Sequence, residues 1–295
     1  MSAESPTAAL IGANGQLGSA FASRLGVHAL SLSRQQCDLE TLNATTAEQW
    51  SRQIPDSVHT LINCAAYNQV DQAETDLQEA FAGNAIGPGE LAKLCELKNW
   101  KLVHISSDYV FGQMQSLPFS GWKETDLPQP GGVYATSKLA GEQLVQAANS
   151  KALILRTCGL YGRARSGGKR NFVETMRHFG KQRGAVRVVN DQHCMPTSVE
   201  TIVTATLQLL KQNESGLFHC TDAGQVTWYE FACEIFQQCG MEVDVTAVPS
   251  TEYPTPAKRP HCSLLDCSKL EATIGTSLPD WKQSLSAYLS NSPVK

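Results

Sequence analysis

The residues with the clearest chemical meaning in this sequence are a tyrosine and a lysine four positions apart, in the stretch Tyr134-Ala-Thr-Ser-Lys138. At the start of a helix this spacing puts both side chains on one face, about 6 Å apart along the axis. A tyrosine, with its usual pKa of about 10, exchanges protons near neutral pH when a positive charge stabilises its phenolate, and Lys138 supplies that charge. Because the pattern is short and common, the alternative is a tyrosine and a lysine on a solvated helix face.

The segment Gly12-Ala-Asn-Gly15-Gln-Leu-Gly18 supports the chemical interpretation, because it directly follows the first apolar run. Glycines allow a tight turn and a close approach of the backbone, and the N–H groups at the start of the next helix favour a pyrophosphate. The spacing is GxxGxxG rather than GxGxxG. A simple strand-to-helix turn is the alternative, but the position between a predicted strand and a predicted helix favours dinucleotide binding.

Ser107 lies in the stretch Ser106-Ser107-Asp108-Tyr109, at the end of another apolar run. The carboxyl ends of strands are where open α/β sheets form ligand crevices, and a serine there can donate a hydrogen bond to a carbonyl group. A glycine-rich turn, a strand-end serine and a tyrosine–lysine pair occur in this order along the chain. Their combination favours an oxidoreductase.

The end of the second predicted strand bears on the choice of cofactor. An NAD-specific site usually has an acidic residue here to bind the ribose 2′-hydroxyl, whereas this chain has Ser33 and Arg34. The Arg34 guanidinium suits the 2′-phosphate of NADP, although it can equally be a solvated surface charge. Asp38, a few residues later, either contacts the adenine or caps the following segment. NADPH and NADH are both candidate cofactors.

Short apolar runs alternate with segments of helical periodicity in the first half of the chain. The predicted strands are residues 8–11, 28–32, 58–63, 102–106 and 152–156, and the predicted helices are 16–25, 71–97 with a break at Gly87-Pro88, 134–148, 199–210 and 228–239. This alternation predicts an α/β fold with a doubly wound parallel sheet of the Rossmann type. We expect a dinucleotide-binding domain at 1–157 and a smaller, loop-rich substrate-binding region at 158–295, with some segments returning to the sheet.

Composition and charge exclude several classes of protein. Hydrophobic residues make up 42% of the chain and charged residues 18%, as in globular proteins, and no apolar run approaches the length of a membrane span. A formal net charge of −4 with scattered charges of both signs argues against a nucleic-acid partner. The ten cysteines form no CxxC pair and are expected to be free thiols. We expect a cytoplasmic protein without a membrane anchor, either a monomer or a homodimer.

The order and spacing of these motifs resemble the extended short-chain dehydrogenase/reductase superfamily and, within it, the dTDP-4-dehydrorhamnose reductase family. The resemblance covers nearly the whole chain. The matching stretches are GANGQLG (12–18), NCAAYNQVDQAE (63–74), SSDYVFG (106–112), YATSKLAGE (134–142), RTCGLYG (156–162), NDQHCMPT (190–197) and RPHCSLLD (259–266). The resemblance implies reduction of the C4 keto group of a nucleotide-activated 4-keto-6-deoxyhexose by NADPH or NADH, in dTDP-L-rhamnose biosynthesis and without a metal.

The resemblance also implies roles for individual residues. Tyr134 would protonate the developing alkoxide, Lys138 would bind the ribose and lower the tyrosine pKa, and Ser107 would steady the carbonyl oxygen. Asp108 would lie beside the sugar, and Arg259 would bind the diphosphate, which suits a planar guanidinium. The residues expected to bind the cofactor, together with Tyr134 and Lys138, are Gly12, Gly15, Gln16, Leu17, Gly18, Arg34, Asp38, Leu39, Ala66, Tyr67 and Asn68.

Three positions depart from the family pattern. Gly159 stands where the family has a tryptophan in the substrate pocket, and Cys194 and Ala135 each replace a glycine. We expect Gly159 to leave a wider or differently filled pocket wall, which bears on the sugar and its stereochemistry. In some members acidic residues on the first helix bind a metal at a dimer contact. The matching stretch here begins Ser19-Ala20, so this metal-linked dimer is not expected.

Two other functions share the same motifs. A sugar-nucleotide dehydratase or epimerase uses the same scaffold, but dehydratases have Thr-Asp-Glu at the strand end, where Asp108 is here followed by Tyr109. The other is a non-catalytic, NADP-binding regulatory subunit of the methionine adenosyltransferase type, which resembles this family and binds another enzyme. The catalytic pair does not exclude it. Asn84 and His219 are expected to be structural.

Overall fold

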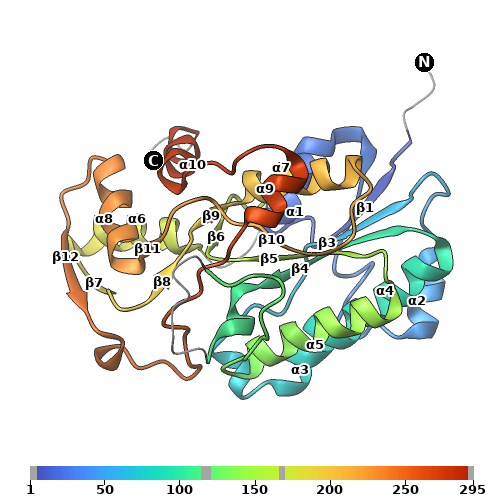
Figure 1. Cartoon of the computed structure of the whole chain (residues 1–295), viewed down its shortest axis with the longest axis horizontal. Coiled ribbons are helices and arrows are strands. Elements are labelled where there is room, and N and C mark those ends of the chain that lie inside the picture. Colours follow the sequence, from blue (N-terminus) through green and yellow to red (C-terminus); the bar gives the residue numbers. More distant parts are fainter. Residues whose placement is uncertain (1–4, 114–120, 166–169, 292–295) are drawn as a thin grey trace.

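A six-stranded parallel sheet forms the centre of the computed structural model (Figure 1), which describes residues 5–113, 121–165 and 170–291. Its strands are β1 (Ala8–Ile11), β2 (Ala29–Leu32), β3 (Thr60–Asn63), β4 (Lys101–Ser107), β5 (Leu153–Thr157) and β10 (Gly216–His219). Their order is β10-β5-β4-β3-β1-β2, with every neighbouring pair parallel. The chain leaves β1 for β2 and returns to β3 on the other side, which creates the switch point where such sheets bind ligands. The predicted doubly wound sheet is confirmed.

Helices cover both faces of this sheet (Figure 1). One face carries α2 (Ala44–Ser51), α4 (Gly87–Lys98) and α5 (Val133–Ala148), and the other carries α1 (Gln16–Leu25), α7 (Val199–Lys211) and α9 (Ser268–Ile274). In β1, Ala9 and Ile11 join the apolar cluster of the first face and Leu10 that of the second. Both faces are therefore buried, which explains why the strands read as continuous apolar runs.

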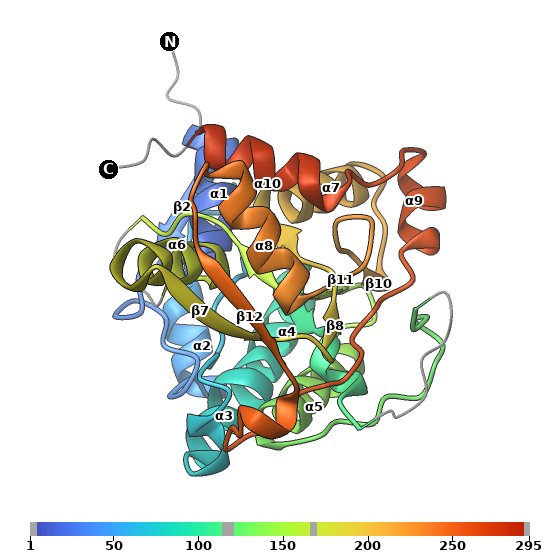
Figure 2. The same cartoon turned by 90° about the vertical axis from the view of Figure 1, so that its left-hand side faces the viewer.

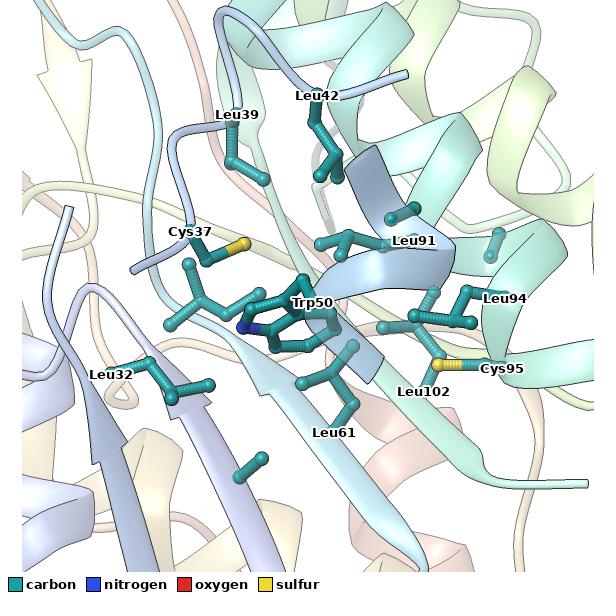
Figure 3. Close-up of a cluster of buried hydrophobic side chains, with 14 of the residues drawn as sticks. Leu32, Cys37, Leu39, Leu42, Trp50, Leu61, Leu91, Leu94, Cys95 and Leu102 are labelled. Atoms are coloured by element: carbon teal, nitrogen blue, oxygen red, sulfur yellow. The ribbon is translucent and has the colours of Figure 1, made fainter. Parts of the chain in front are cut away.

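Trp50 of α2 lies at the centre of the cluster on the first face (Figure 3). It is 5% exposed and packs near Leu61 of β3. Helix α2, which the sequence patterns did not predict, begins with a capping box formed by Asn43 and Thr46. The Leu39 side chain belongs to the same cluster. This core therefore holds in place the loop after β2, which carries several predicted cofactor residues.

Beyond residue 157, the segments other than α7, β10 and α9 pack largely around a second, smaller sheet (Figure 2). Strand β7 (Ala185–Val189) pairs in parallel with β12 (Asp244–Val248), and the helices of this region are α6 (Phe172–Arg183), α8 (Trp228–Gln238) and α10 (Trp281–Ser290). The shorter strand pairs are β6 (Leu160–Tyr161) with β9 (Thr197–Ser198), and β8 (His193–Cys194) with β11 (Val226–Thr227). Phe231, Ile235 and Leu285 lie in its core. This region has more regular structure than we expected, and the division at residue 157 remains a prediction.

The segment predicted as one helix at residues 71–97 is divided. It contains a 3-10 turn (Gln72–Glu74), α3 (Leu77–Phe81), a π-helical turn (Ala82–Ile86) and α4. Gly87-Pro88 does not break the helix; it begins α4, where a proline lacks no needed N–H. A Cβ on Gly87 would lie 2.3 Å from the Leu39 carbonyl oxygen, so the glycine lets α4 pass close to the loop after β2.

The ten cysteines are all free thiols, as predicted. Burial raises the pKa of the thiols of Cys37 and Cys95, which therefore stay protonated and act as packing groups. Among the helices that the structure describes, none is long and apolar enough to cross a membrane.

Candidate active site

The glycine-rich segment forms the turn between β1 and α1. Gly12 has a φ of +76°, and a Cβ there would lie 2.7 Å from the backbone nitrogen of Ala65 after β3. A Cβ on Gly18 would lie 2.2 Å from the Gly12 carbonyl oxygen. At Gly15 a Cβ would meet a single described atom within 4 Å, the same oxygen at 3.3 Å. Two glycines therefore close the turn, and the third leaves space above the start of α1.

The start of α1 has the properties of a phosphate site. Gly15 is the N-cap and provides no side-chain cap for the first N–H groups of the helix. The Gln16 side chain points away, because its Oε1 accepts hydrogen bonds from Gly162 N at 2.8 Å and Asn171 Nδ2 at 3.0 Å. The uncapped N–H groups, the helix dipole and the space that a Cβ at Gly15 would fill fit the pyrophosphate of a dinucleotide.

Arg34 follows β2 and lies between two carboxylates. Its Nε donates to Asp38 Oδ2 at 3.0 Å, and its terminal nitrogen pairs with Glu40 Oε2 at 2.6 Å. The hydrogen bond with Asp38 and the charge of Glu40 raise the pKa of Arg34. The structure thus brings two predicted residues together and adds Glu40, which the sequence patterns did not single out. To bind Arg34, a 2′-phosphate would have to compete with the carboxylates of Asp38 and Glu40 for the guanidinium.

The loop after β3 is held by a buried asparagine. Ala66 and Asn68 are exposed and Tyr67 is buried between them. The Tyr67 N–H donates to Asn84 Oδ1 at 2.9 Å, while Asn84 Nδ2 donates to the Tyr67 carbonyl at 2.9 Å and to Ser137 Oγ at 3.0 Å. Because Ser137 lies on α5, Asn84 joins the predicted cofactor loop to the predicted catalytic helix. In the sequence, Asn84 could have been recognised as a polar residue on the buried face of a predicted helix.

The end of β4 and the start of α5 bring together the three predicted catalytic residues. Ser107 ends β4, and Tyr134 and Lys138 lie on the first two turns of α5. Lys138 Nζ donates to the Ile105 carbonyl oxygen of β4 at 2.6 Å. The ring of Tyr109 contacts that of Tyr134 edge-on, with 5.7 Å between centroids. One side chain from the strand and two from the helix therefore lie together at the carboxyl edge of the sheet, where such sheets bind ligands.

Burial controls the protonation of the tyrosine and the lysine. Desolvation raises the pKa of Tyr134 to about 12, with Ser107 opposing the rise and Asp108 adding to it, so the expected lowering of this pKa by Lys138 was wrong for the free protein. Desolvation lowers the pKa of Lys138 to about 8, and the Glu142 carboxylate opposes the fall. Near neutral pH Tyr134 is a phenol that can donate a proton, and Lys138 is an ammonium that a modest rise in pH neutralises. Reduction of a ketone needs this protonation state.

Asp108 is 3% exposed and lies beside Ser107. Its Oδ1 accepts a hydrogen bond from Ser107 Oγ at 3.0 Å, whereas its Oδ2 is buried with no hydrogen-bond partner among the described residues. Burial raises the pKa of Asp108, and the neighbouring side chains of Cys158, Ser263 and Ser107 oppose the rise. A buried acceptor without a partner is unfavourable, so Oδ2 fits a hydroxyl of a bound ligand.

Residues 7–293 match the family described as the RmlD substrate binding domain. The dTDP-4-dehydrorhamnose reductase of Mycolicibacterium smegmatis is 36% identical over 282 residues, which cover 94% of this chain and 83% of that protein. This chain belongs to the dTDP-4-dehydrorhamnose reductase family. It is therefore an NAD(P)-dependent oxidoreductase, as predicted.

Solved structures of dTDP-4-dehydrorhamnose reductases share the fold. The Bacillus anthracis protein, solved in complex with NADP, is 34% identical with a TM-score of 0.89, and the match covers 98% of this chain and 100% of that one. The Clostridium acetobutylicum protein is 36% identical with a TM-score of 0.88, covering 97% and 99%.

Gly159 stands where the family pattern has a tryptophan, and its backbone conformation suits a glycine. Gly159 has a φ of +54°, which favours glycine. A Cβ at this position would lie 3.3 Å from Pro196 Cα and 3.4 Å from Cη2 of Trp228 at the start of α8. Trp228 therefore lies next to the position that the family tryptophan would occupy, and the shape of the pocket wall remains a prediction. Cys194 and Ala135, the other departures of this chain from the reductase family, are buried.

Arg259, which the family resemblance assigns to the diphosphate, pairs with Asp71. Its terminal nitrogen lies 2.7 Å from Asp71 Oδ2, and its other one donates to the Ala257 carbonyl at 3.3 Å. Burial raises the pKa of Tyr109, and the charge of Arg259 opposes that rise. Among the described residues no hydrogen bond joins Arg259 to the catalytic group.

Proposed function

We propose that this protein reduces the C4 keto group of a dTDP-linked 4-keto-6-deoxyhexose, with NADPH or NADH as reductant, in dTDP-L-rhamnose biosynthesis. The proposal rests on one observation: Ser107, Tyr134 and Lys138 converge at the sheet edge that also carries the uncapped start of α1. Family membership supports the substrate class. In this proposal residues 1–157 bind the dinucleotide and 158–295 provide most of the nucleotide-sugar site.

The cofactor, when bound, supplies the hydride for the carbonyl carbon. The turn from Gly12 to Gly18 and the first N–H groups of α1 bind its pyrophosphate. The other proposed cofactor residues are Arg34, Asp38, Leu39, Ala66, Tyr67, Asn68, Tyr134 and Lys138. Because the Leu39 side chain lies in the apolar core, its proposed contact comes from its backbone.

Side chains of the protein donate the proton and stabilise the developing negative charge. Tyr134, whose pKa of about 12 keeps the phenol protonated, donates its proton to the substrate carbonyl oxygen. The Ser107 hydroxyl, which donates to Asp108 Oδ1 in the free protein, turns its proton to the same carbonyl oxygen, which favours the transition state as charge accumulates there. The Lys138 ammonium stabilises the phenolate. Asp108 Oδ2 accepts a hydrogen bond from a sugar hydroxyl, and Arg259 binds the diphosphate.

The test measures consumption of NADPH, and of NADH in parallel, by the purified protein with freshly generated dTDP-4-keto-6-deoxyhexose. Tyr134→Phe keeps the ring and removes the proton donor, so we expect kcat to fall by about 10²- to 10⁴-fold. Tyr229→Phe on α8, outside the proposed catalytic group, is the matched control and should retain turnover.

Full turnover by Tyr134→Phe would refute the catalytic assignment. Cofactor binding without turnover of any keto sugar, together with a stable complex with another enzyme, would favour the regulatory-subunit function instead.

A further inference from the structure

Helix α5 carries a third ionisable side chain in line with Tyr134 and Lys138. Glu142 follows Lys138 by four residues, so the three side chains lie along one face of the helix. Glu142 is 5% exposed and faces Arg156 of β5. Its Oε1 accepts a hydrogen bond from Arg156 Nε at 2.9 Å, and its Oε2 accepts one from a terminal nitrogen of the same guanidinium at 2.7 Å. The Glu142 carboxylate and the Arg156 guanidinium are therefore paired inside the protein, one helical turn beyond Lys138.

The same carboxylate is bonded to the end of β4. Glu142 Oε1 accepts a hydrogen bond from Ser106 Oγ at 2.5 Å, and the preceding carbonyl, that of Ile105, accepts one from Lys138 Nζ at 2.6 Å. Three consecutive residues of one strand end thus bind the lysine, bind the glutamate and carry the Ser107 hydroxyl. A displacement of Glu142 would shift Ser106 and, through the backbone, Ser107.

Arg156 also contacts the segment that precedes α5. Its remaining terminal nitrogen lies 3.4 Å from His219 Nε2, and His219 Nδ1 lies 2.9 Å from the Trp122 carbonyl oxygen. Burial and the charge of Arg156 lower the pKa of His219 to about 3, so the ring is neutral, donating from Nδ1 and accepting at Nε2. The guanidinium carbon lies 5.1 Å from the Phe111 ring centroid. Every nitrogen of Arg156 is therefore engaged, which fixes the Glu142 carboxylate.

A buried ion pair is weak evidence for a role in stability, since apolar residues of similar volume are often as stable. We propose that Glu142 is a positioning residue for the reduction: its carboxylate, fixed by Arg156, holds the strand end of Ser107 and keeps the Lys138 ammonium charged beside the Ile105 carbonyl. The role assigned to Glu142 rests on the proposed function, because it acts through Lys138 and Ser107.

The charged and titratable groups around Lys138 give the direction of the effect. On α5 these are Tyr134, a neutral phenol, and the Glu142 carboxylate; on β4 there is His104, whose pKa burial and Lys138 lower; and on β5 there is the Arg156 cation. Burial lowers the pKa of Lys138 to about 8, and the charge of Glu142 raises it. Neutralising Glu142 therefore lowers the pKa of Lys138 further, and the ammonium is lost at a lower pH.

The experiment compares two variants with the wild type. Glu142→Gln keeps the shape and an acceptor for Ser106, and the double variant Glu142→Gln/Arg156→Met also removes the buried cation that would otherwise be unpaired. Glu48→Gln, which breaks an exposed ion pair on α2, is the control. The readouts are an NMR titration of labelled Lys138 without cofactor or substrate, and the pH profile of kcat/KM.

We expect Lys138 to titrate about one pH unit lower, or more, in Glu142→Gln, and to shift by a smaller amount in the double variant, which also loses the repulsion of the Arg156 cation. The value of kcat/KM in Glu142→Gln should then fall about fivefold or more near pH 8 and stay within about threefold of the wild type near pH 6. An unchanged Lys138 titration in the folded Glu142→Gln variant would overturn the proposal even if activity fell, because a purely structural role lowers activity equally at all pH values. The titration needs no substrate, so failure of the proposed reduction shows separately, as a wild type without turnover.

Discussion

Lys138 is a charged side chain in surroundings that disfavour charge. It is 3% exposed, and desolvation lowers its pKa from 10.5 to about 8, while the same burial raises the pKa of Tyr134 to about 12. Burial therefore keeps the proton on the phenol and places the lysine near its point of titration. On a solvated helix face the phenol would also be protonated at neutral pH, whereas a lysine with its ordinary pKa would stay charged to a much higher pH.

Removing this buried charge should make the protein more stable and inactive. The folded-state pKa of Lys138 lies below the unfolded value of 10.5, so the folded protein binds fewer protons between about pH 8 and pH 10.5, and the free energy of unfolding rises with pH across that window. Below this window, burial of the charged ammonium costs the folded state about 3 kcal/mol. Lys138→Met removes this cost but also loses the hydrogen bond to the Ile105 carbonyl, which is worth about 1 kcal/mol. We expect Lys138→Met to gain about 2 kcal/mol near pH 7 and less near pH 10.

Urea denaturation at both pH values measures this difference, and Lys93→Met, on an exposed face of α4, is the control that should show neither effect. A Lys138→Met protein less stable than the wild type near pH 7 contradicts the prediction.

Asn84 is the second residue whose environment decides its role. It is fully buried, and Asn84→Ala leaves both the N–H and the carbonyl of Tyr67 without their partner. We expect a loss of about 2–4 kcal/mol in the free energy of unfolding and weaker NADPH binding, because the loop after β3 loses its anchor. Chemical denaturation and fluorescence titration check the two effects, with exposed Gln78→Ala as control. Unchanged NADPH affinity would separate Asn84 from the cofactor site.

At the scale of the element, the turn between β1 and α1 separates folding from binding. A methyl group on Gly18 would lie 2.2 Å from the Gly12 carbonyl oxygen, so Gly18→Ala should lower stability by about 1–3 kcal/mol. A methyl group on Gly15 would lie 3.3 Å from the same oxygen, so Gly15→Ala should stay folded. The methyl group would occupy the space proposed for the cofactor pyrophosphate, so NADPH affinity should be about tenfold lower. Thermal unfolding and cofactor titration of both variants distinguish these effects; equal behaviour of the two would refute the assignment.

Helices and strands were predictable from the sequence where several local patterns occur together. β1 and α1 have the predicted bounds, because an apolar run, a glycine turn and a helical apolar stripe follow one another there. Helix α6 was missed although its signals are present: Asn171 caps the N–H of Glu174, and Gly184 ends the helix with a φ of +64°. Gly- and Arg-rich flanks obscured these caps. The π-helical turn that presents Asn84 has no comparable signal, since it depends on packing against α5.

At the scale of the molecule, assembly depends on contacts that local patterns do not encode. The sixth strand, β10, comes from residues 216–219 and pairs with β5, more than fifty residues earlier in the chain. The Gln16 side chain at the cofactor turn bonds to Gly162 and Asn171, and Trp122 pairs with Leu265. Motif order placed the catalytic residues near one another, while the partners that fix them come from the whole chain.

The ion pair between Arg259 and Asp71 joins the Pro-rich segment before α9 to the loop after β3, and it makes the diphosphate assignment testable. If Arg259 binds the diphosphate, Asp71 competes for the guanidinium, so the two variants should have opposite effects. We expect Arg259→Ala to raise KM for the nucleotide sugar about tenfold or more with a smaller change in kcat, and Asp71→Asn to lower KM. Arg259→Lys should resemble Arg259→Ala more than the wild type, because a lysine lacks the paired donors that fit a diphosphate.

Steady-state kinetics at low and high salt measure these values, and the Arg259 effect should shrink as salt screens the charges. A parallel loss of kcat/KM and thermal stability in Arg259→Ala and Asp71→Asn would instead assign the pair to holding the two segments together, since a structural tie is broken equally from either side.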